Sequence, residues 1–365
     1  MRILIVNKHL EDEIGGSEVQ CNIIARHLKA YGHEVIYGAV KSRRPSYNCS
    51  YEVVPLKKLN FRSLRRTILE TRPDLVYWRY NKKSLLVAGI LCKLYGLKMV
   101  FSISHINDTK KWSHKSVRLG ERIQQLISGR INYLGYRFVD GVVSLRKDLA
   151  ESVPSYRTIK KTVIYNSMTP ELSGSFQWDR PYIFWVATIK KPKQPELFIK
   201  AAERLADKPF DFLMVGRIFD DSYSYIKEGT GLPANFHYLG MKTPNEVNTI
   251  LRSSLFLVHT CHHEGFSNNF IQAWLQEKPT ISLSFDPDGF IEGHGIGYCS
   301  GSFDRMCAQI VELFENEELR RQMGIRARDV AERLFRPDIN VKAYEQFFKS
   351  ILGTRGMRES GEYPI

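Results

Sequence analysis

The chain has 365 residues, of which 43% are hydrophobic and 25% charged, and its formal net charge is +14. No apolar run approaches the ~18 residues that a membrane-spanning helix needs, and the first apolar stretch leads straight into polar and acidic residues, unlike a signal peptide. The expected compartment is the cytoplasm. Six cysteines without a C-x-x-C pair favour reduced thiols over a disulfide framework.

The positive charge is concentrated in the first half of the chain. Residues 1–170 contain 30 Lys and Arg against 13 Asp and Glu, whereas residues 171–365 contain 23 against 26. This asymmetry indicates an anionic partner for the first half, such as phospholipid head groups, a phosphorylated acceptor or nucleic acid. A solvated basic face without a partner is the alternative.

In chain order, strands alternate with helices. The apolar run at 2–7 predicts a strand, and Ser17-x-x-Gln20 predicts a capping box that opens an amphipathic helix. Further elements are expected as strands at 34–40, 74–78, 97–103, 141–145 and 162–165, and as helices around 61–71, 83–95 and 113–137. Repeated βα units of this kind imply a parallel sheet that is covered on both faces.

The alternation resumes after a segment rich in Pro, Gly and Ser. Thr243-Pro244-x-Glu246 predicts a second capping box. The expected elements are strands at 182–187, 211–215, 236–239, 255–259 and 280–284, and closing helices at 302–315, 317–334 and 338–352.

The predicted fold class is α/β, with two Rossmann-like doubly wound domains that face each other across a cleft. The N-terminal domain is expected at 1–168 and the C-terminal domain at 182–337, joined by a linker at 169–181. Residues 338–365 are expected to form a helix that crosses back to the first domain, followed by a loose tail. Ligands of such domains bind at the carboxyl ends of the strands.

The most informative segment is 264–269, Glu-Gly-Phe-Ser-Asn-Asn, between a predicted strand and a predicted helix. Backbone amides at such a helix start attract phosphate, so a nucleotide diphosphate fits there. Gly15-Gly16 follows the first strand but lacks the G-x-G-x-x-G pattern of dinucleotide-binding proteins. The glycine pair lets the backbone approach a ligand closely, and a plain loop is the alternative.

Two metal-like motifs are interpreted as structural, and no metal is expected. Asp286-Pro287-Asp288-Gly289 has the Asp-x-Asp spacing of metal-binding sugar transferases, but Asp-Pro and Asp-Gly favour a turn. Cys261-His262-His263 converges poorly on one ion, because successive residues of an extended segment point to opposite faces.

Taken together, the motifs resemble the retaining, GT-B-fold glycosyltransferases of family four over nearly the whole chain. The residues that carry the resemblance are Gly15-Gly16-Ser17-Glu18, His105, 140–145, 165–167, 193–198, Val215-Gly216, Leu239-Gly240 and, most specifically, 264–269. The resemblance implies no cofactor and a UDP- or GDP-sugar as donor substrate.

The resemblance also implies a role for each matching residue. Glu264 is expected to bind hydroxyls of the donor sugar, Lys193 to neutralise the leaving diphosphate, and His105 to approach the sugar. The implied donor-binding residues are Gly15, Gly16, Thr188, Arg217, Met241, Ser267, Asn268, Asn269 and Gln272. Fixed cations and aligned amides lower the barrier to bond breaking without a metal. Each residue taken singly has a structural alternative.

The chain departs from the family pattern at two positions. Gln272 stands where the family usually has a glutamate, and an amide still bonds to a ribose diol. Thr188 stands where a phosphate-binding arginine is usual, which removes a bidentate clamp. Lys190, Lys191 or Arg217 could restore the charge; otherwise activity is weak.

Basic residues accompany apolar ones at helical spacing in the first half of the chain. The candidates for membrane or acceptor contact are Lys57, Lys58, Arg62, Arg65, Arg66, Arg118 and Arg122. A helix with a basic face beside an apolar one can lie on an anionic membrane. The alternative is that the apolar stripes pack onto the sheet while the charges face water.

The leading hypothesis is a metal-independent retaining transferase that moves a sugar from a nucleotide-diphosphate donor to a glycan or lipid-linked acceptor. It is expected in the cytoplasm, peripheral at the inner membrane surface, in cell-surface polysaccharide or glycolipid synthesis. The alternatives are a catalytically silent relative that binds a nucleotide or glycan, and a sugar-nucleotide epimerase. Nucleic acid is not an expected partner, since no RNA- or DNA-binding motif is present, and the oligomeric state is left open.

Overall fold

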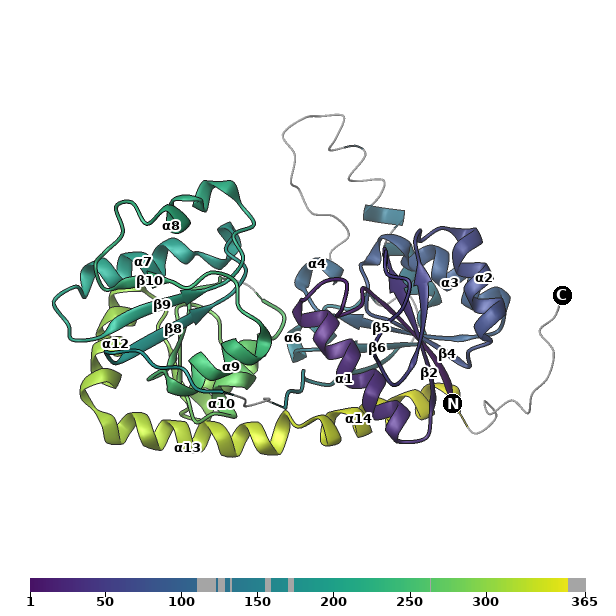
Figure 1. The fold of residues 1–365 in the computed structure, drawn as a ribbon. Helices are drawn as coiled ribbons and strands as arrows, with labels where there is room; N and C mark the ends of the chain where they lie inside the picture. The colour runs from purple at the N-terminus through teal and green to yellow at the C-terminus, as the bar shows by residue number, and fades with distance from the viewer. Residues whose placement is uncertain are drawn as a thin grey trace. The chain divides into compact units, whose positions relative to one another are not determined.

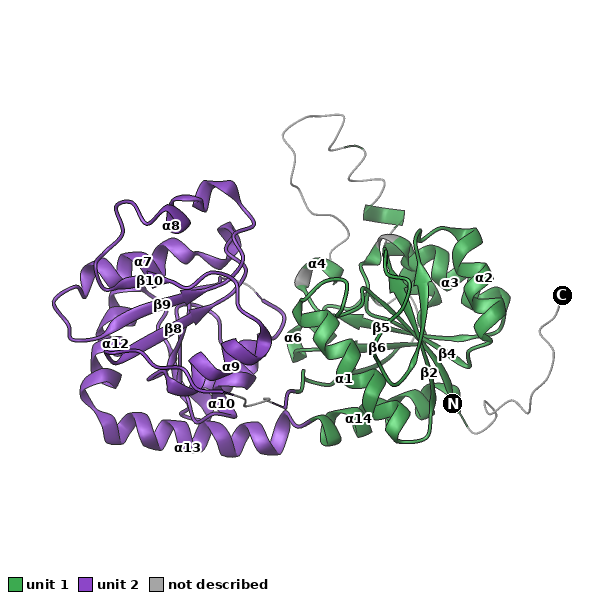
Figure 2. Cartoon of the chain, in the orientation of Figure 1, with its two compact units in different colours: residues 1–167, 337–365 green, residues 168–336 purple. Residues whose placement is uncertain are grey.

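The computed structural model describes residues 1–109, 123, 129–131, 133–154, 159–169, 174–262 and 264–353. The chain divides into two compact units: unit 1 comprises residues 1–167 and 337–365, and unit 2 comprises residues 168–336 (Figure 2). Each unit has its own parallel sheet with helices packed on it (Figure 1). The predicted class, two Rossmann-like α/β domains, is therefore confirmed.

The sheet of unit 1 has seven parallel strands in the order β3-β2-β1-β4-β5-β6-β7. The strands are β1 (Arg2–Asn7), β2 (Glu34–Val40), β3 (Glu52–Leu56), β4 (Leu75–Trp78), β5 (Lys98–Ile103), β6 (Gly141–Ser144) and β7 (Lys160–Val163). The chain adds strands on one side of β1 and then returns to its other side with β4. This switch point lies where ligands bind in doubly wound sheets.

Helices cover both faces of this sheet. They are α1 (Gly16–Ala30), α2 (Phe61–Thr71), α3 (Leu85–Leu94), α4 (Ile106–Thr109), α6 (Lys147–Glu151) and α14 (Pro337–Leu352). Successive residues of β1 alternate between two buried clusters, with Leu4 and Val6 in one and Ile3 and Ile5 in the other. The first cluster includes residues of α2 and α3, and the second includes residues of α1 and α14.

The sheet of unit 2 has six parallel strands in the order β10-β9-β8-β11-β12-β13. The strands are β8 (Tyr182–Val186), β9 (Asp211–Val215), β10 (Phe236–Tyr238), β11 (Leu257–His259), β12 (Thr280–Ser282) and β13 (Gly297–Cys299). The helices are α7 (Pro195–Arg204), α8 (Tyr225–Glu228), α9 (Pro244–Ser253), α10 (Asn268–Trp274), α11 (Phe290–Gly293), α12 (Phe303–Glu315) and α13 (Glu317–Leu334). Its switch point lies between β8 and β11.

The last helix, α14, belongs to unit 1 although it follows unit 2 in the sequence (Figure 1). It packs against α1, and Asn340 Nδ2 donates hydrogen bonds to the carbonyls of Tyr165 and Asn166 at 3.2 and 3.3 Å. The units divide after residues 167 and 336, whereas the sequence-based bounds place the ends of the two domains at 168 and 337.

One capping prediction is confirmed and one is wrong. Thr243 and Glu246 form the predicted reciprocal box at the start of α9. Ser17 does not cap α1, which begins at Gly16 with Gly15 as its N-cap residue and no side-chain cap bond. Gln20 is buried and bonds instead to the backbone of Ser167. These buried hydrogen bonds stabilise the fold more than an exposed capping box with Ser17 would.

The edge strands are where the sequence-based assignment differs most from the structure. Strands β3 and β13, both at sheet edges, were not predicted, and β7 lies at 160–163 rather than 162–165. Edge strands are short and half covered, so they lack the continuous apolar run of a central strand. Most of the helix predicted at 113–137, residues 170–173 of the linker and the tail beyond Gly353 lie outside the described residues.

Candidate functional site

An ion pair between Lys193 and Glu264 forms the centre of the candidate site in unit 2. Lys193 ends the short turn η3 (Lys191–Lys193) after β8, and Glu264 lies in the turn between β11 and α10. Because β8 and β11 are neighbours, their carboxyl ends bring the two side chains together. Only 20% of the Lys193 side chain and 14% of the Glu264 side chain are exposed.

Hydrogen bonds hold the Lys193 turn against the segment that follows β11. Trp185 Nε1 donates to Thr260 Oγ1 at 2.9 Å, and this hydroxyl donates to the carbonyl of Lys193 at 2.7 Å. Cys261 Sγ donates to the carbonyl of Pro192 at 3.2 Å. The ammonium group is therefore carried by a braced turn rather than by a loose surface loop.

The surroundings of Lys193 lower its pKa overall. Burial lowers the pKa of Lys193 from its ordinary value, and the nearby Lys190 acts in the same direction. Cys261 acts in the opposite direction, and the ammonium group is paired with the Glu264 carboxylate. A partly desolvated cation paired with a carboxylate is well suited to exchange that partner for a phosphate.

A buried histidine, His259, lies beside this pair, with its Nε2 3.7 Å from Glu264 Oε1. Burial and the neighbouring Lys193 ammonium lower the pKa of His259 to about 3. Among the described residues, His259, Cys261 and Glu264 place possible metal-ligand atoms within 4.8 Å of one another. A cation there would have to compete with the Lys193 ammonium for Glu264.

The side chains of the two metal-like sequence motifs contact several different segments. Cys261 bonds toward Pro192, whereas His262 Nδ1 lies 3.1 Å from Ser284 Oγ, so the two side chains meet different segments. His263 lies outside the described residues. Asp286 accepts bonds from the backbone N–H groups of residues 291 and 292 at 2.8 and 3.1 Å. The Asp286–Gly289 segment is a turn that opens α11.

The loop before α10 contains the other residues of the specific motif. Ser267 is the N-cap residue of α10 and is 4% exposed, and Asn268 is the first helical residue. Asn269 Nδ2 donates to the carbonyl of Val186 at 2.6 Å, which ties α10 to the carboxyl end of β8. Gln272 is buried and donates to Asn248 Oδ1 of α9 at 3.0 Å. Asn269 and Gln272 thus both hold α10 in place.

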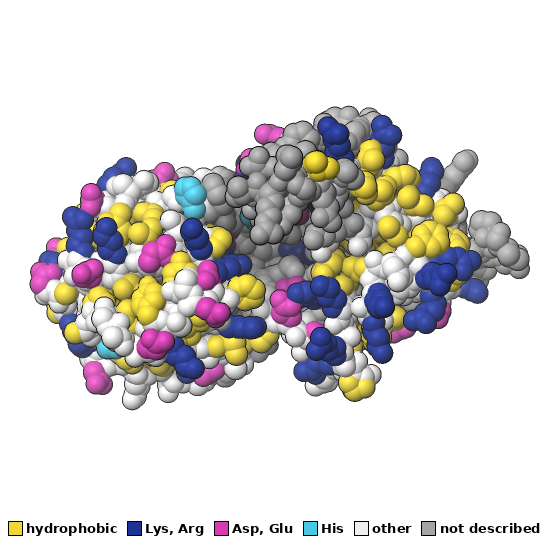
Figure 3. Space-filling model, turned by 90° about the horizontal axis from the view of Figure 1, so that it is seen from above, with side chains coloured by type: hydrophobic (Ala, Val, Ile, Leu, Met, Phe, Trp, Pro, Cys, Tyr) yellow, Lys and Arg dark blue, Asp and Glu magenta, His cyan; other side chains and the backbone are white. Residues whose placement is uncertain are grey.

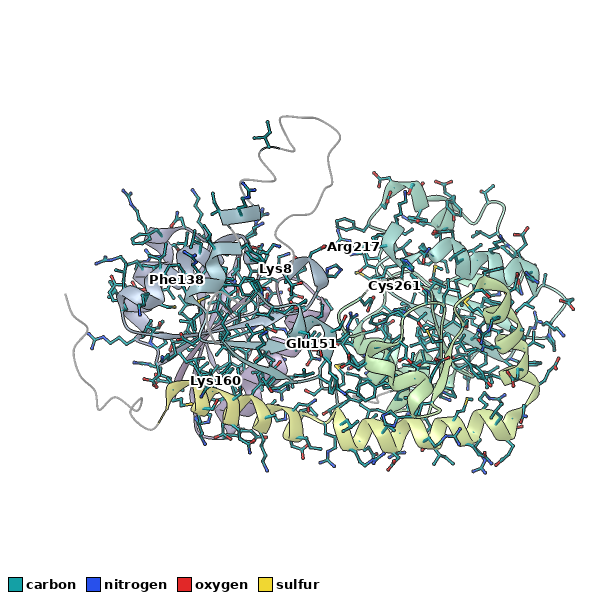
Figure 4. All side chains as sticks on the ribbon, turned by 180° about the vertical axis from the view of Figure 1, so that it is seen from behind. Lys8, Phe138, Glu151, Lys160, Arg217 and Cys261 are labelled. Carbon is teal, nitrogen blue, oxygen red and sulfur yellow. The ribbon has the colours of Figure 1, made fainter. Side chains whose placement is uncertain are left out.

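Three further predicted donor-binding residues lie at the same carboxyl edge of the sheet. Thr188, Arg217 and Met241 follow β8, β9 and β10, and all three are exposed; Arg217 and Cys261 are labelled in Figure 4. The backbone at Gly216 passes so close to β8 that a Cβ atom there would lie 1.8 Å from a carbonyl oxygen. Only glycine permits this approach.

Gly15, Gly16 and His105 belong to unit 1 and lie at the carboxyl edge of its own sheet. The glycines follow β1, and a Cβ atom at Gly15 would lie 2.4 Å from Glu18 Oε2. His105 follows β5, and its Nδ1 accepts a bond from the N–H of Asn107 at 3.1 Å. This bond places the ring hydrogen of the neutral form on Nε2.

The basic residues of the first half divide into two groups. Lys57, Lys58, Arg62, Arg65 and Arg66 are exposed, and Lys and Arg side chains are visible over unit 1 in the space-filling view (Figure 3). The apolar stripe of α2 is buried through Leu64 and Ile68, so it packs onto the sheet. Arg118 and Arg122 lie outside the described residues.

None of the helices that the structure describes is both long enough and apolar enough to cross a lipid bilayer.

Unit 2 also has a hollow at the amino end of β8, lined by Phe176, Trp178, Tyr182 and Ser253 among others. It is at the opposite edge of the sheet from Lys193 and Glu264.

Sequence reasoning missed the residues that support the ion pair, namely Trp185, Thr260, His259 and Ser282. They belong to or flank three neighbouring strands, and only the register of those strands brings them together. The alternation of His259 and Cys261 on one face of an extended segment was the only local signal.

Two protein-family models match the chain, one over each half of its sequence. The model for "Glycosyltransferase Family 4" matches residues 14–172, and the model for "Glycosyl transferases group 1" matches residues 171–330. The chain belongs to the group 1 glycosyltransferases.

Individual relatives are distant. An uncharacterized glycosyltransferase of Methanocaldococcus jannaschii is 23% identical over 51% of this chain, and the alignment spans 52% of that relative, about half its length. The sucrose-phosphate synthase of Thermosynechococcus elongatus has a TM-score of 0.78 at 14% identity, covering 96% of this chain and 99% of that one. Anabaena HepE, solved with UDP and glucose, has a TM-score of 0.71 at 15% identity, covering 96% and 100%. These structures share the fold.

Proposed function

We propose that this protein is a retaining glycosyltransferase that moves a sugar from a UDP- or GDP-sugar to a glycan or lipid-linked acceptor. The observation that carries the proposal is the Lys193–Glu264 pair at the carboxyl ends of two central strands of unit 2. Family membership and the UDP and glucose present in the HepE structure support it.

The chemistry of glycosyl transfer matches the pair. As the bond to the anomeric carbon breaks, negative charge develops on the diphosphate and positive charge on the sugar. The Lys193 ammonium stabilises the first, and the Glu264 carboxylate accepts hydrogen bonds from sugar hydroxyls. In the donor-free protein the two groups neutralise each other, and a bound donor gives each a partner of its own.

The missing arginine at position 188 is compensated by other cations. Arg217 and Lys191 are exposed at the same edge of the sheet, and Lys190 is half-buried there. Together with Lys193 they supply the charge that a diphosphate requires, so no metal ion is needed. The backbone amides of Ser267 and Asn268 face the same edge in this proposal and bind the phosphates.

The acceptor belongs on unit 1 in this proposal. Its exposed basic residues attract a lipid-linked saccharide or a phosphorylated glycan at an anionic membrane surface. The protein then acts in the cytoplasm at the inner membrane face, in synthesis of a cell-surface polysaccharide or glycolipid. The attraction is electrostatic, because the apolar stripe of α2 is packed inside the unit.

The test is a panel of UDP- and GDP-sugars incubated with purified protein and a membrane extract, with nucleotide release and product mass measured. Glu264→Ala is expected to abolish turnover, whereas the exposed Glu203→Ala on α7 serves as the matched control. Release of no nucleotide from any donor, or full activity of Glu264→Ala, contradicts the proposal. Product NMR shows whether the anomeric configuration is retained.

Two alternatives are distinguished by the same panel. Thr188 and Gln272 favour a silent relative, which binds a donor tightly in calorimetry but turns over no acceptor. A sugar-nucleotide epimerase converts the donor in the absence of any acceptor. Each outcome is separate from transfer, which requires both substrates.

A further inference from the structure

His259 is buried behind the Lys193–Glu264 pair and has no part in the chemistry above. It ends β11, and only 7% of its side chain is exposed. Its Nε2 lies 3.7 Å from Glu264 Oε1, and no hydrogen-bond partner of Nε2 is found among the described residues. A buried ring nitrogen of this kind is costly unless it serves the carboxylate that it faces.

The register of the sheet decides which ring nitrogen carries the hydrogen. His259 is paired with Ser282 on β12, and Ser282 Oγ lies 3.3 Å from His259 Nδ1. Ser282 Oγ accepts a bond from the N–H of Phe285 at 3.3 Å, and Ser282 is fully buried. Because this hydroxyl is buried, its own hydrogen needs an acceptor, and Nδ1 at 3.3 Å supplies one. The ring hydrogen is then left on Nε2, toward Glu264.

The position of Nε2 opposite Glu264 Oε1 agrees with this tautomer. With the hydrogen on Nδ1, an Nε2 lone pair would face the carboxylate oxygen and repel it, whereas an Nε2–H attracts it. The ring of Phe270 packs edge-on against His259, with centroids 4.6 Å apart at an interplanar angle of 64°. This contact limits rotation of the imidazole. Burial and the Lys193 ammonium lower the pKa of His259, so the ring is neutral near pH 7.

We infer that His259, held by Ser282, is a positioning residue whose Nε2–H orients the Glu264 carboxylate for the donor sugar. This inference rests on the proposed function. Lys193 and His259 approach the same oxygen, Oε1. When a diphosphate draws Lys193 away, the neutral histidine remains as a partner of that oxygen and leaves the other oxygen to the sugar hydroxyls.

The kinetic test uses three variants and one cycle. His259→Phe keeps an aromatic ring without a donor and is expected to lower kcat/KM about tenfold or more, as for a lost hydrogen bond to a charged group. His259→Gln keeps an N–H near the Nε2 position and is expected to recover most of the loss. In a Glu264→Gln background, His259→Phe is expected to cause little further loss, because its effect passes through that carboxylate. An equal fold-loss in both backgrounds would overturn the inference.

The second test does not depend on turnover, so it remains decisive even if the protein turns over none of the donors tested. Nitrogen-15 NMR of the histidines is expected to show His259 as the neutral Nε2–H tautomer at pH 7, with the preference relaxed in Ser282→Ala. An Nδ1–H tautomer or an imidazolium would overturn the inference. Denaturant midpoints of the His259→Phe and Glu264→Gln cycle are expected to be non-additive. If no donor is turned over but the tautomer and the non-additive midpoints are observed as expected, only the proposed transferase activity is contradicted.

Discussion

The side-chain amide of Gln20 both donates a hydrogen bond to the backbone of Ser167 and accepts one from it. Its Nε2 donates to the carbonyl of Ser167 at 2.8 Å, and its Oε1 accepts from the N–H at 2.9 Å. Both groups are buried, and Ser167 is the residue at which the chain leaves unit 1. This one side chain therefore joins α1 to the end of the first half of the unit.

Gln20→Leu is expected to destabilise the protein, because it leaves a buried N–H and a buried carbonyl without partners. The expected loss is about 1–3 kcal/mol for each orphaned group at most, measured by chemical denaturation with unit-specific probes. The control is Gln322→Leu, where the side chain bonds on the exposed surface of α13. Equal stability of the Gln20 variant would show that water replaces the lost bonds.

Lys193→Ala is expected to lower kcat by about 10²–10³, the loss typical for one group that stabilises developing charge. Lys193→Arg should recover only part of the rate, because a planar guanidinium keeps the charge but is larger than the ammonium group and differently shaped. Lys227→Ala, at an exposed lysine of α8, is the matched control. The rate is measured by steady-state kinetics with a saturating donor. An unchanged kcat would show that Lys193 takes no part in the chemical step.

Stability of unit 2 is expected to fall between about pH 6.5 and pH 3 through His259. The folded pKa is lowered from 6.5 to about 3, so in that window the unfolded chain binds a proton that the folded chain does not. Stability therefore rises with pH through the window, by about 2 kcal/mol between pH 5 and pH 7 from this group. Urea denaturation at both pH values checks it, and His259→Phe should flatten the dependence. If the stability of the His259→Phe variant depends on pH as steeply as that of the parent protein, His259 is not a neutral buried ring in the folded state.

Turnover is expected to survive treatment with EDTA, because Lys193 occupies the place beside Glu264 where a cation would act. The measurement is the transfer rate before and after chelation and dialysis. Loss of activity that Zn²⁺ restores would instead indicate a metal held by His259, Cys261 and Glu264. Loss that Mg²⁺ restores would point to a metal delivered with the donor.

Binding to vesicles with anionic lipids is expected to fall steeply with salt, because exposed charges are screened within ~10 Å at moderate ionic strength. Lys57→Gln with Lys58→Gln should weaken it, since both residues are exposed beside α2. Lys227→Gln with Arg321→Gln in unit 2 is the charge-matched control. Flotation assays measure the bound fraction, and equal binding to neutral vesicles would rule out the electrostatic attraction.

The sequence by itself determined the fold class and most central elements. Strands such as β1 and β9 are continuous apolar runs that are buried on both faces, and such runs are visible without any partner. Thr243 and Glu246 define a helix start through contacts three residues apart, which are also local. The motif at 264–269 marked Glu264 as a candidate, because a strand, a turn and a helix follow one another directly in the chain.

Only the tertiary structure decided what surrounds Glu264. The pairing of β8 with β11 brings Lys193 to it, and the pairing of His259 with Ser282 sets the hydrogen on the imidazole. In the tertiary structure Gly15 rather than Ser17 is the N-cap residue of α1, and Gln20 bonds to the backbone of Ser167. These contacts depend on strand register and on burial, which arise from residues far apart in the chain, so no local pattern encodes them.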